Sequence, residues 1–173
     1  MNRVKDFSYI AGFFDGEGCI TSTIVKKKNR DTHHVYSIII ITNTNLEVLK
    51  YIQKVFGFGR INEKKYEKHR KTRCWAYTID SSSEILEFLQ SIRPYLRVKD
   101  EQADLAVEYL KSRLSKTLTN SNTPLTLQEV SCIFNIRLLT QRTPGEKIKY
   151  KNKLYSLEEF IVLLNSNRTK NFI

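Results

Sequence analysis

The segment FSYIAGFFDGEGCI, residues 7–20, joins an apolar run to two acidic residues set among glycines. A stripe of apolar residues at helical spacing predicts a helix with one buried side: Phe7, Ile10, Ala11 and Phe14. We expect Asp6 to cap the N-terminus of that helix. Asp15 and Glu17 then fall at its C-terminal end, where the helix dipole disfavours a carboxylate by about 0.3–1 kcal/mol. Acids at such a position indicate a role other than helix stability.

Small residues recur at every fourth position of the same helix. Ser8, Gly12 and Gly16 form this ridge, and Ala11 lies beside it. A ridge of small side chains allows two helix backbones to approach closely. The pattern therefore predicts a helix–helix contact, with packing of Gly12 against its own sheet as the alternative.

The glycines around Glu17 permit a sharp exit from the helix and close approach by a ligand. If two such helix ends met across a twofold axis, their carboxylates would crowd together and require a cation. Carboxylate and backbone carbonyl oxygens are ligands that suit Mg²⁺. The alternative is a plain acidic turn.

The composition limits the class of protein. The chain has 173 residues, of which 40% are hydrophobic, and its formal net charge is +11. It is long enough for one globular domain with a real core. The positive charge predicts a polyanionic partner, nucleic acid first and an anionic membrane second. The sequence contains no apolar stretch near the ~20 residues of a membrane span, so we expect no membrane insertion.

The cysteines Cys19, Cys74 and Cys132 are odd in number and widely spaced. This favours free thiols in a reducing, intracellular compartment, and the N-terminus lacks the apolar region of a secretory signal. The sequence has no zinc-binding spacing. His33 and His34 are adjacent and would point to opposite faces of a strand, which argues against a histidine metal site.

The remaining patterns predict a mixed α+β fold. Strands are predicted at 19–25, 33–42, 59–66 and 73–80, and further helices at 46–56, 84–92 and about 100–114. Asn45 precedes the helix at 46–56, and Gly57 is expected to end it. Capping-box spacing occurs at Ser81 and Glu84, at Thr126 and Glu129, and at Ser156 and Glu159. The order α-ββ-α-ββ-α indicates helices covering one face of a four-stranded antiparallel sheet. We assign residues 1–114 to this core and 115–173, after a polar linker at 115–123, to a C-terminal helical extension of the same domain.

The segment YIAGFFDGEGCI, residues 9–20, resembles the signature of the LAGLIDADG homing endonucleases. From Ile10 to Gly18, the small residues, the apolar helix positions and the terminal acid occur in the same order as in that signature. Residues 41–61 and 92–107 resemble later segments of the family, so the resemblance covers about residues 7–114. One copy of the signature is typical of the homodimeric type.

This resemblance implies a saddle-shaped sheet that sits on DNA and signature helices that form the subunit interface. In the family the last acid of the signature binds the divalent metal, which corresponds to Glu17, and the carbonyl before it, that of Gly16, also faces the metal. Asp15 corresponds to a position at the helix end and interface. The implied dimer interface comprises Ser8, Ala11, Gly12, Phe13 and Asp15.

The resemblance also implies a basic residue near the scissile phosphate. Lys99 occupies that position, with Arg97 as a lesser candidate. The family commonly has a glutamine after the second strand that holds water, where this chain has the shorter Asn43. Glu17, Lys99 and Asn43 are thus the predicted catalytic residues of a metal-assisted hydrolysis.

Strand alternation and basic loops predict the DNA-binding surface. Trp75, Tyr77 and Ile79 are expected in the core. The predicted DNA-binding residues are Thr21, Thr23, Val25, Lys26, Lys27, Lys28, Arg30, His34, Tyr36, Asn62, Lys64, Arg70, Lys71, Arg73 and Thr78.

The predicted function is a homodimeric, Mg²⁺-dependent, site-specific DNA endonuclease, with Mn²⁺ expected to substitute. A strand of about 10 residues spans roughly 33 Å, or about 10 base pairs, so the dimer should contact about 20 base pairs of nearly palindromic double-stranded DNA. Two alternatives on the same fold stay open: an RNA maturase that binds intron RNA, and a non-cleaving DNA-binding regulator. The expected location is a mitochondrion, a chloroplast, or an archaeal or bacterial cytoplasm.

Overall fold

The computed structural model describes residues 3–26, 33–64, 72–117, 125–141, 145–151 and 153–165. The core follows the predicted order: α1 (Arg3–Glu17), β1 (Gly18–Lys26), β2 (His33–Asn43), α2 (Leu46–Phe56), β3 (Arg60–Glu63), β4 (Trp75–Ile79), α3 (Ser82–Ile92), the 3₁₀ turn η1 (Arg93–Tyr95) and α4 (Asp100–Thr117). The extension contains α5 (Leu127–Thr140), β5 (Ile148–Tyr150), β6 (Lys153–Tyr155) and α6 (Leu157–Asn165). The α4 helix thus includes the first residues of the predicted linker.

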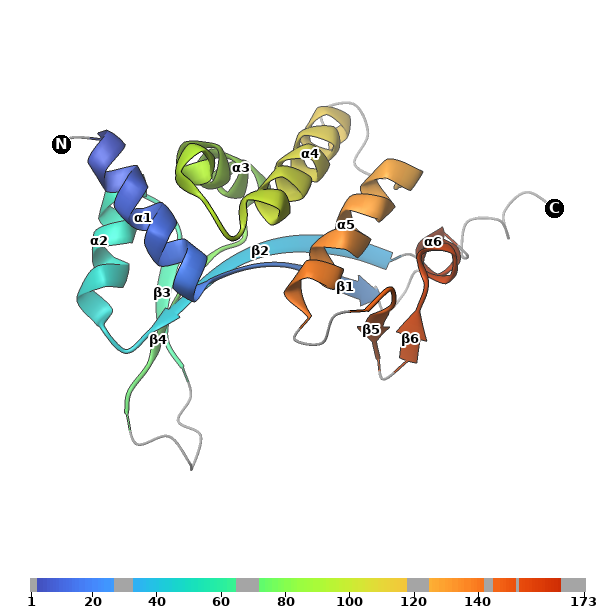
Figure 1. The fold of residues 1–173 in the computed structure, drawn as a ribbon, viewed down its shortest axis with the longest axis horizontal. Coiled ribbons are helices and arrows are strands. Elements are labelled where there is room, and N and C mark those ends of the chain that lie inside the picture. The colour runs from blue at the N-terminus through green and yellow to red at the C-terminus, as the bar shows by residue number, and fades with distance from the viewer. Residues whose placement is uncertain are drawn as a thin grey trace.

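Strands β1 to β4 form one antiparallel sheet in the order β1-β2-β4-β3. The long β1 and β2 strands curve under a layer of helices, and the β3–β4 ends project away from that layer (Figure 1). Helices α1 to α4 therefore cover one face of the sheet and leave the concave face uncovered.

The buried face of the sheet follows from strand alternation. Its fully or nearly buried side chains include Ile20, Ile24, Ile39, Ile41, Tyr77 and Ile79. These residues join Phe14 of α1 and Phe88 of α3 in one hydrophobic cluster, which continues into the extension through Ile133 and Phe160. Residues 1–114 and the C-terminal extension therefore share one hydrophobic core.

Several predicted helix ends are confirmed. The Asn45 side chain accepts the N–H of Glu47 at 3.0 Å, and Gly57 ends α2 with a φ of 78°. Thr126 and Glu129 form the capping box of α5. At α6 the backbone N–H of Ser156 donates to Glu159 at 2.9 Å, as the spacing predicted.

Two predicted caps are wrong. Helix α1 begins at Arg3, so Asp6 lies inside it and accepts the Tyr51 hydroxyl at 2.7 Å. Ser81 precedes α3 but makes no side-chain cap, because its hydroxyl pairs with that of Ser83 at 3.0 Å. In both places a competing hydrogen bond takes the predicted capping group.

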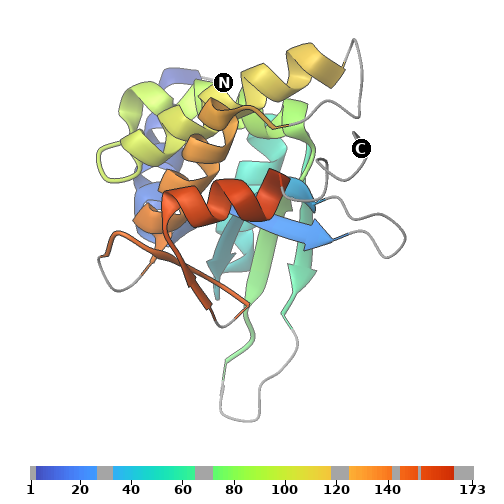
Figure 2. The same cartoon turned by 90° about the vertical axis from the view of Figure 1, so that its right-hand side faces the viewer.

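The extension contains a short hairpin that the sequence patterns did not predict. Strands β5 and β6 have three residues each, too few to show a period. Arg137 of α5 holds this region to the sheet, donating to the Ser22 carbonyl at 2.7 Å and to the Lys149 carbonyl at 3.1 Å. Figures 1 and 2 place the hairpin and α6 at the outer end of β1, with the hairpin below the sheet.

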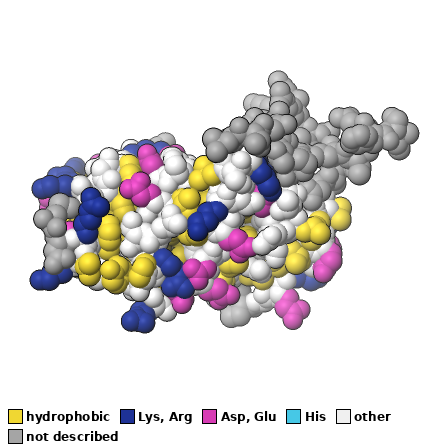
Figure 3. Space-filling view, turned by 90° about the horizontal axis from the view of Figure 1, so that it is seen from above, with side chains coloured by type: hydrophobic (Ala, Val, Ile, Leu, Met, Phe, Trp, Pro, Cys, Tyr) yellow, Lys and Arg dark blue, Asp and Glu magenta, His cyan; other side chains and the backbone are white. Residues whose placement is uncertain are grey.

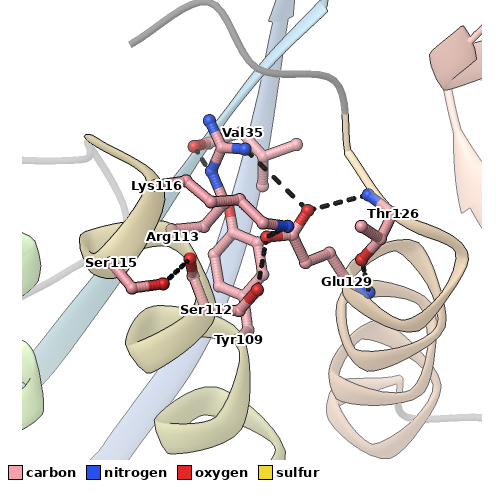
Figure 4. Close-up of polar contacts among 8 residues, drawn as sticks. All are labelled: Val35, Tyr109, Ser112, Arg113, Ser115, Lys116, Thr126 and Glu129. Atoms are coloured by element: carbon pink, nitrogen blue, oxygen red, sulfur yellow. Dashed lines mark hydrogen bonds and ion pairs between the residues drawn. The ribbon is translucent and has the colours of Figure 1, made fainter. Parts of the chain in front are cut away.

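A buried carboxylate ties α5 to α4 (Figure 4). Glu129 accepts hydrogen bonds from Lys116 and Ser112 of α4, both at 2.8 Å, and from the Thr126 N–H at 2.8 Å. Arg113 lies 3.8 Å away. These contacts satisfy a charge that would be costly to bury alone. Within the described residues, no helix combines the length and apolar character needed to cross a membrane.

Candidate active site and DNA-facing surface

The exit from α1 into β1 is sterically fixed. A Cβ atom on Gly18 would lie 2.1 Å from the Phe14 ring, so only glycine fits where the chain turns. Phe14 is itself buried and makes an edge contact with Phe88, the ring centroids being 5.4 Å apart. This packing sets the position of Glu17, the last residue of α1.

Asp15 connects the end of α1 to the segment before α4. Its carboxylate accepts the backbone N–H of Arg97 at 2.8 Å and that of Lys99 at 3.0 Å. The Lys99 ammonium in turn donates to the Asp15 carbonyl. The fold thus brings Lys99 into contact with the signature helix. From the sequence, a position for Lys99 near the active site was implied only by the family resemblance.

The charges at this helix end are complementary. The last carbonyls of a helix lack helical partners and carry partial negative charge, which a lysine ammonium stabilises. Loss of hydration raises the pKa of the nearby Cys19 thiol, and the Lys99 charge opposes that rise. Lys99 therefore places a positive charge beside the first outward-facing residue of β1.

The Glu17 carboxylate is exposed and has no hydrogen-bond or ion-pair partner among the described residues. The surface next to it is open at Gly16, because no described atom outside the neighbouring part of α1 comes within 4 Å of a Cβ placed on that glycine. In the described part of the chain, no cluster of three or more His, Cys, Asp or Glu forms a metal site. A free carboxylate and adjacent carbonyls fit a hard cation such as Mg²⁺.

Asn43 lies at the same end of the sheet, two residues beyond Ile41, the pairing partner of Gly18. Its side-chain oxygen accepts the Asn45 N–H at 2.8 Å and so shapes the turn into α2. The structure gives Asn43 this local contact, and its predicted role with water stays a prediction.

One face of α1 is uncovered. Val4, Ser8, Gly12 and Gly16 are exposed along it, and beyond the neighbouring part of α1 no described atom comes within 4 Å of a Cβ on either glycine. The alternative in which Gly12 packs against its own sheet is therefore wrong. Phe13 is partly buried at the margin and packs against the core.

The assignment of Ala11 to the interface ridge is wrong. Ala11 is fully buried within the hydrophobic cluster of its own chain. Helical geometry explains the difference, because Ala11 shares the inward stripe with Ile10 and Phe14 rather than the outward stripe of Gly12.

The sheet register locates the outward face. Thr21 and Thr23 alternate with buried Ser22 and Ile24, and Thr23 pairs with the exposed Tyr36. On β4, Thr78 alternates with buried Tyr77 and Ile79, as predicted. The predicted Asn62 and Lys64 are exposed on and beside β3.

Arg73 does not lie on this outward face of the sheet. It lies two residues before β4 and pairs with Glu63 at 3.6 Å, and Glu63 is the register partner of Trp75 rather than of Ala76. Several other predicted DNA contacts lie outside the described residues: Lys27, Lys28, Arg30, Arg70 and Lys71, together with the side chains of Val25, Lys26 and His34.

The register adds outward-facing residues that the sequence prediction missed. They are Ile38, Ile40, Thr42 and Arg60. The run of four isoleucines in β2 hid two of them, because a run without alternation does not reveal its face. A small cavity of about 110 Å³ beside Thr21 is also lined by Lys149 of the β5–β6 hairpin. The alternating lysines at 147, 149, 151 and 153 were the available signal for this basic hairpin.

Comparisons with known proteins agree with this arrangement. A model of the LAGLIDADG endonuclease family matches residues 10–104, more than half of the chain. The DNA endonuclease I-CvuI of Chlorella vulgaris is 26% identical over 138 residues, covering 78% of this chain and 79% of that protein.

Solved structures show the same fold. The archaeal intron-encoded homing endonuclease I-Vdi141I, in complex with DNA, superposes with a TM-score of 0.71 at 20% identity, covering 96% of this chain and 98% of that one. I-CvuI with DNA and Mg²⁺ gives a TM-score of 0.62 at 22% identity, with 95% of each chain covered. The signature helix, the curved sheet and these matches establish that the chain belongs to the LAGLIDADG endonuclease family and has the homing-endonuclease fold.

Proposed function

We propose that this site-specific DNA endonuclease acts as a homodimer, requires a divalent cation, and cuts a nearly palindromic site of about 20 base pairs. The observation that carries the catalytic part is the contact of Lys99 with Asp15, two residues before the exposed Glu17 at the end of α1. A carboxylate that can hold a cation and an ammonium that can face a phosphate are thereby held within one turn of helix.

Glu17, the Gly16 carbonyl and Lys99 would have different roles in the reaction. Glu17 and the Gly16 carbonyl would hold Mg²⁺, with Mn²⁺ as a substitute, and the cation would supply Lewis-acid stabilisation of the phosphate and an activated water. Lys99 would stabilise negative charge that develops on the scissile phosphate. Structures of I-CvuI with DNA were obtained with Mg²⁺ and with Ca²⁺, which supports a divalent-cation site.

The uncovered face of α1 supports a dimer. Its glycines would let a second α1 approach closely, and the two Glu17 carboxylates would then lie near each other at the twofold axis. Val4, 59% exposed, and the exposed Ser8 would flank this contact. Each copy contributes one active site, so cutting both strands needs both copies.

The concave face of the sheet is the proposed DNA surface. Strand β2 has 11 residues, which at about 3.3 Å each span roughly 36 Å, close to 10 base pairs. Threonines, Tyr36 and Asn62 would contact base edges, while basic groups at the margins, including Lys149, would contact phosphates. The opposite surface, over the helices, shows described Lys and Arg side chains interspersed with Asp and Glu (Figure 3).

The site of action should be a compartment with DNA and reducing conditions, either an organelle or a prokaryotic cytoplasm. Cys19, Cys74 and Cys132 are all free thiols, which agrees with such conditions.

The test is cleavage of a randomised DNA library by the purified protein with Mg²⁺, followed by sequencing of the cut products. The expected result is a consensus with twofold symmetry and a strict requirement for a divalent cation. The Glu17→Gln variant is the matched control and should enrich no sequence. Binding of DNA without cutting by the natural protein would favour the regulator, and binding of structured RNA alone would favour the maturase.

A further inference from the structure

Two isoleucines lie in the middle of the DNA-facing surface. Ile38 and Ile40 alternate with the fully buried Ile39 and Ile41, so their side chains emerge on the uncovered face of β2. Both are partly exposed, and neither belongs to the hydrophobic cluster or packs against it. Large apolar side chains on a polar ligand-binding face therefore call for an apolar group on the ligand.

Their neighbours also carry apolar groups on this face. Ile40 pairs with Cys19 on one side and with Thr78 on the other, and Ile38 pairs with Thr21. Thr78 and Thr21 each carry a methyl group, and Ala76 lies on the same face as Ile40, one outward position along β4. The centre of the sheet thus offers methyl groups and the Cys19 thiol beside the threonine hydroxyls.

The register also fixes where these side chains lie relative to the chemistry. Ile40 is opposite Cys19, two residues after the Glu17 carboxylate. Ile38 follows at a distance of two residues along β2, about 6.7 Å, which is roughly two base-pair steps. Ile40 therefore faces the DNA nearest the cut, and Ile38 faces it about two pairs further out.

We propose that Ile38 and Ile40 recognise the C5-methyl groups of thymines at two positions, about two base pairs apart, in the half-site bound by each copy. This inference rests on the proposed function and specifies its substrate. In the major groove only thymine presents a methyl group, whereas guanine and cytosine present acceptors or an amino donor. An isoleucine cannot replace the water that those polar groups lose, so C·G or G·C at these positions is disfavoured.

The sharpest test removes one methyl group from the DNA. First, the cleavage consensus is obtained as above. Then thymine is replaced by deoxyuridine, one position at a time, and binding is measured in Ca²⁺. The expected loss is about fourfold at each of the two positions, equivalent to the ~0.8 kcal/mol of one buried methyl group. Cytosine at the same position should cost roughly 5- to 150-fold, and 5-methylcytosine should recover part of that loss.

Two protein variants separate recognition from folding. Ile40→Val keeps an apolar β-branched side chain and should retain sensitivity to deoxyuridine. Ile40→Asn should bind thymine and deoxyuridine equally at the inner position, while deoxyuridine at the outer position, facing Ile38, should still cost about fourfold. That retained outer effect shows that the variant is folded. Thr23→Ala is the matched control on the same face and should leave both methyl effects unchanged.

The outcomes are distinct. A natural protein that cuts or binds no library member overturns the proposed function and this inference together. A protein that cuts specifically but tolerates deoxyuridine at every thymine, or selects C·G at both the inner and the outer position, overturns only the role of the isoleucines. In that case Ile38 and Ile40 serve the stability of β2 alone.

Discussion

Asp15 and Lys99 hold each other in place at the end of the signature helix. The Asp15 carboxylate accepts the Lys99 backbone N–H at 3.0 Å, and the Lys99 ammonium returns a hydrogen bond to the Asp15 carbonyl. The aspartate thus acts through the lysine and is a positioning residue, while Lys99 is the proposed catalytic one.

Asp15→Ala and Lys99→Met should therefore differ in stability. Removing the carboxylate leaves two backbone N–H groups unpaired and should lower the free energy of unfolding by about 1–2 kcal/mol. Lys99→Met should change it by less than about 1 kcal/mol but reduce single-turnover cutting by roughly 100- to 1,000-fold. Urea unfolding and single-turnover kinetics measure the two effects. Equal stability of natural protein and Asp15→Ala would show that this contact does not order the segment before α4.

Glu17→Gln should abolish cutting and preserve DNA binding. The amide is nearly isosteric, and the natural carboxylate has no partner among the described residues to lose. A neutral amide holds a hard cation far less well than a carboxylate. Gel shifts in Ca²⁺ and cutting assays in Mg²⁺ on the same duplex check this, with Glu87→Gln on the exposed surface of α3 as control. Near-normal cutting by Glu17→Gln would remove Glu17 from the proposed mechanism.

Gly12→Leu should convert the dimer to a monomer without unfolding the chain. Apart from the neighbouring part of α1, no described atom of the same chain lies within 4 Å of the new Cβ, and leucine favours a helix over glycine by roughly 0.8 kcal/mol. Overpacking a close helix contact costs about 1–3 kcal/mol, and each copy contributes to that contact. Sedimentation should show monomer for Gly12→Leu and dimer for the control Gln90→Leu on α3. A persistent dimer would place the interface elsewhere.

Lys149→Ala should reduce the salt dependence of DNA binding. Lys149 is exposed beside Thr21 of the proposed DNA surface, so it is placed to contact a phosphate there. Loss of one such contact should lower the slope of log affinity against log salt by about one unit. Lys111→Ala, on the exposed side of α4, should leave the slope unchanged. Replacement of Lys26, Lys27 and Lys28 together should lower it by up to about three units.

Glu129 should make the fold sensitive to acid. Burial by itself would raise the pKa of Glu129, but hydrogen bonds from Lys116, the Thr126 N–H and Ser112 outweigh it and hold the pKa below the ordinary 4.5. A lowered folded pKa stabilises the protein above pH 4.5, and this stabilisation is lost as the pH falls through the folded value.

Glu129→Gln should consequently lower the free energy of unfolding by roughly 1.5–3 kcal/mol at pH 7. It should also flatten the fall in stability as the pH drops below about 4.5. Denaturant unfolding across that range measures both, and Glu101→Gln on the exposed start of α4 should retain the natural pH profile. An unchanged profile in Glu129→Gln would assign acid sensitivity to other groups.

Local sequence determined most of the fold. Several features depend only on residues close together in the sequence, so they can be predicted without the rest of the chain. They are the apolar stripe of α1, the ends of α2 at Asn45 and Gly57, and the capping boxes of α5 and α6. The signature also indicated Glu17 and the uncovered ridge at Gly12. These features follow from helical period and backbone chemistry, which act over a few residues.

Tertiary structure alone decided the features that depend on distant partners. The face of the β2 isoleucines was set by pairing with β1 and β4, since a run of four identical apolar residues has no period of its own. Asp6 and Ser81 found other hydrogen-bond partners, and Ala11 turned inward. Asp15 contacts Lys99 only because packing brings the end of α1 to the segment before α4. In the same way, the buried Glu129 of α5 pairs with Lys116 only because α5 packs against α4. The hydrophobic pattern specifies which residues must be buried, but the space that remains around each polar group is known only when the elements have packed.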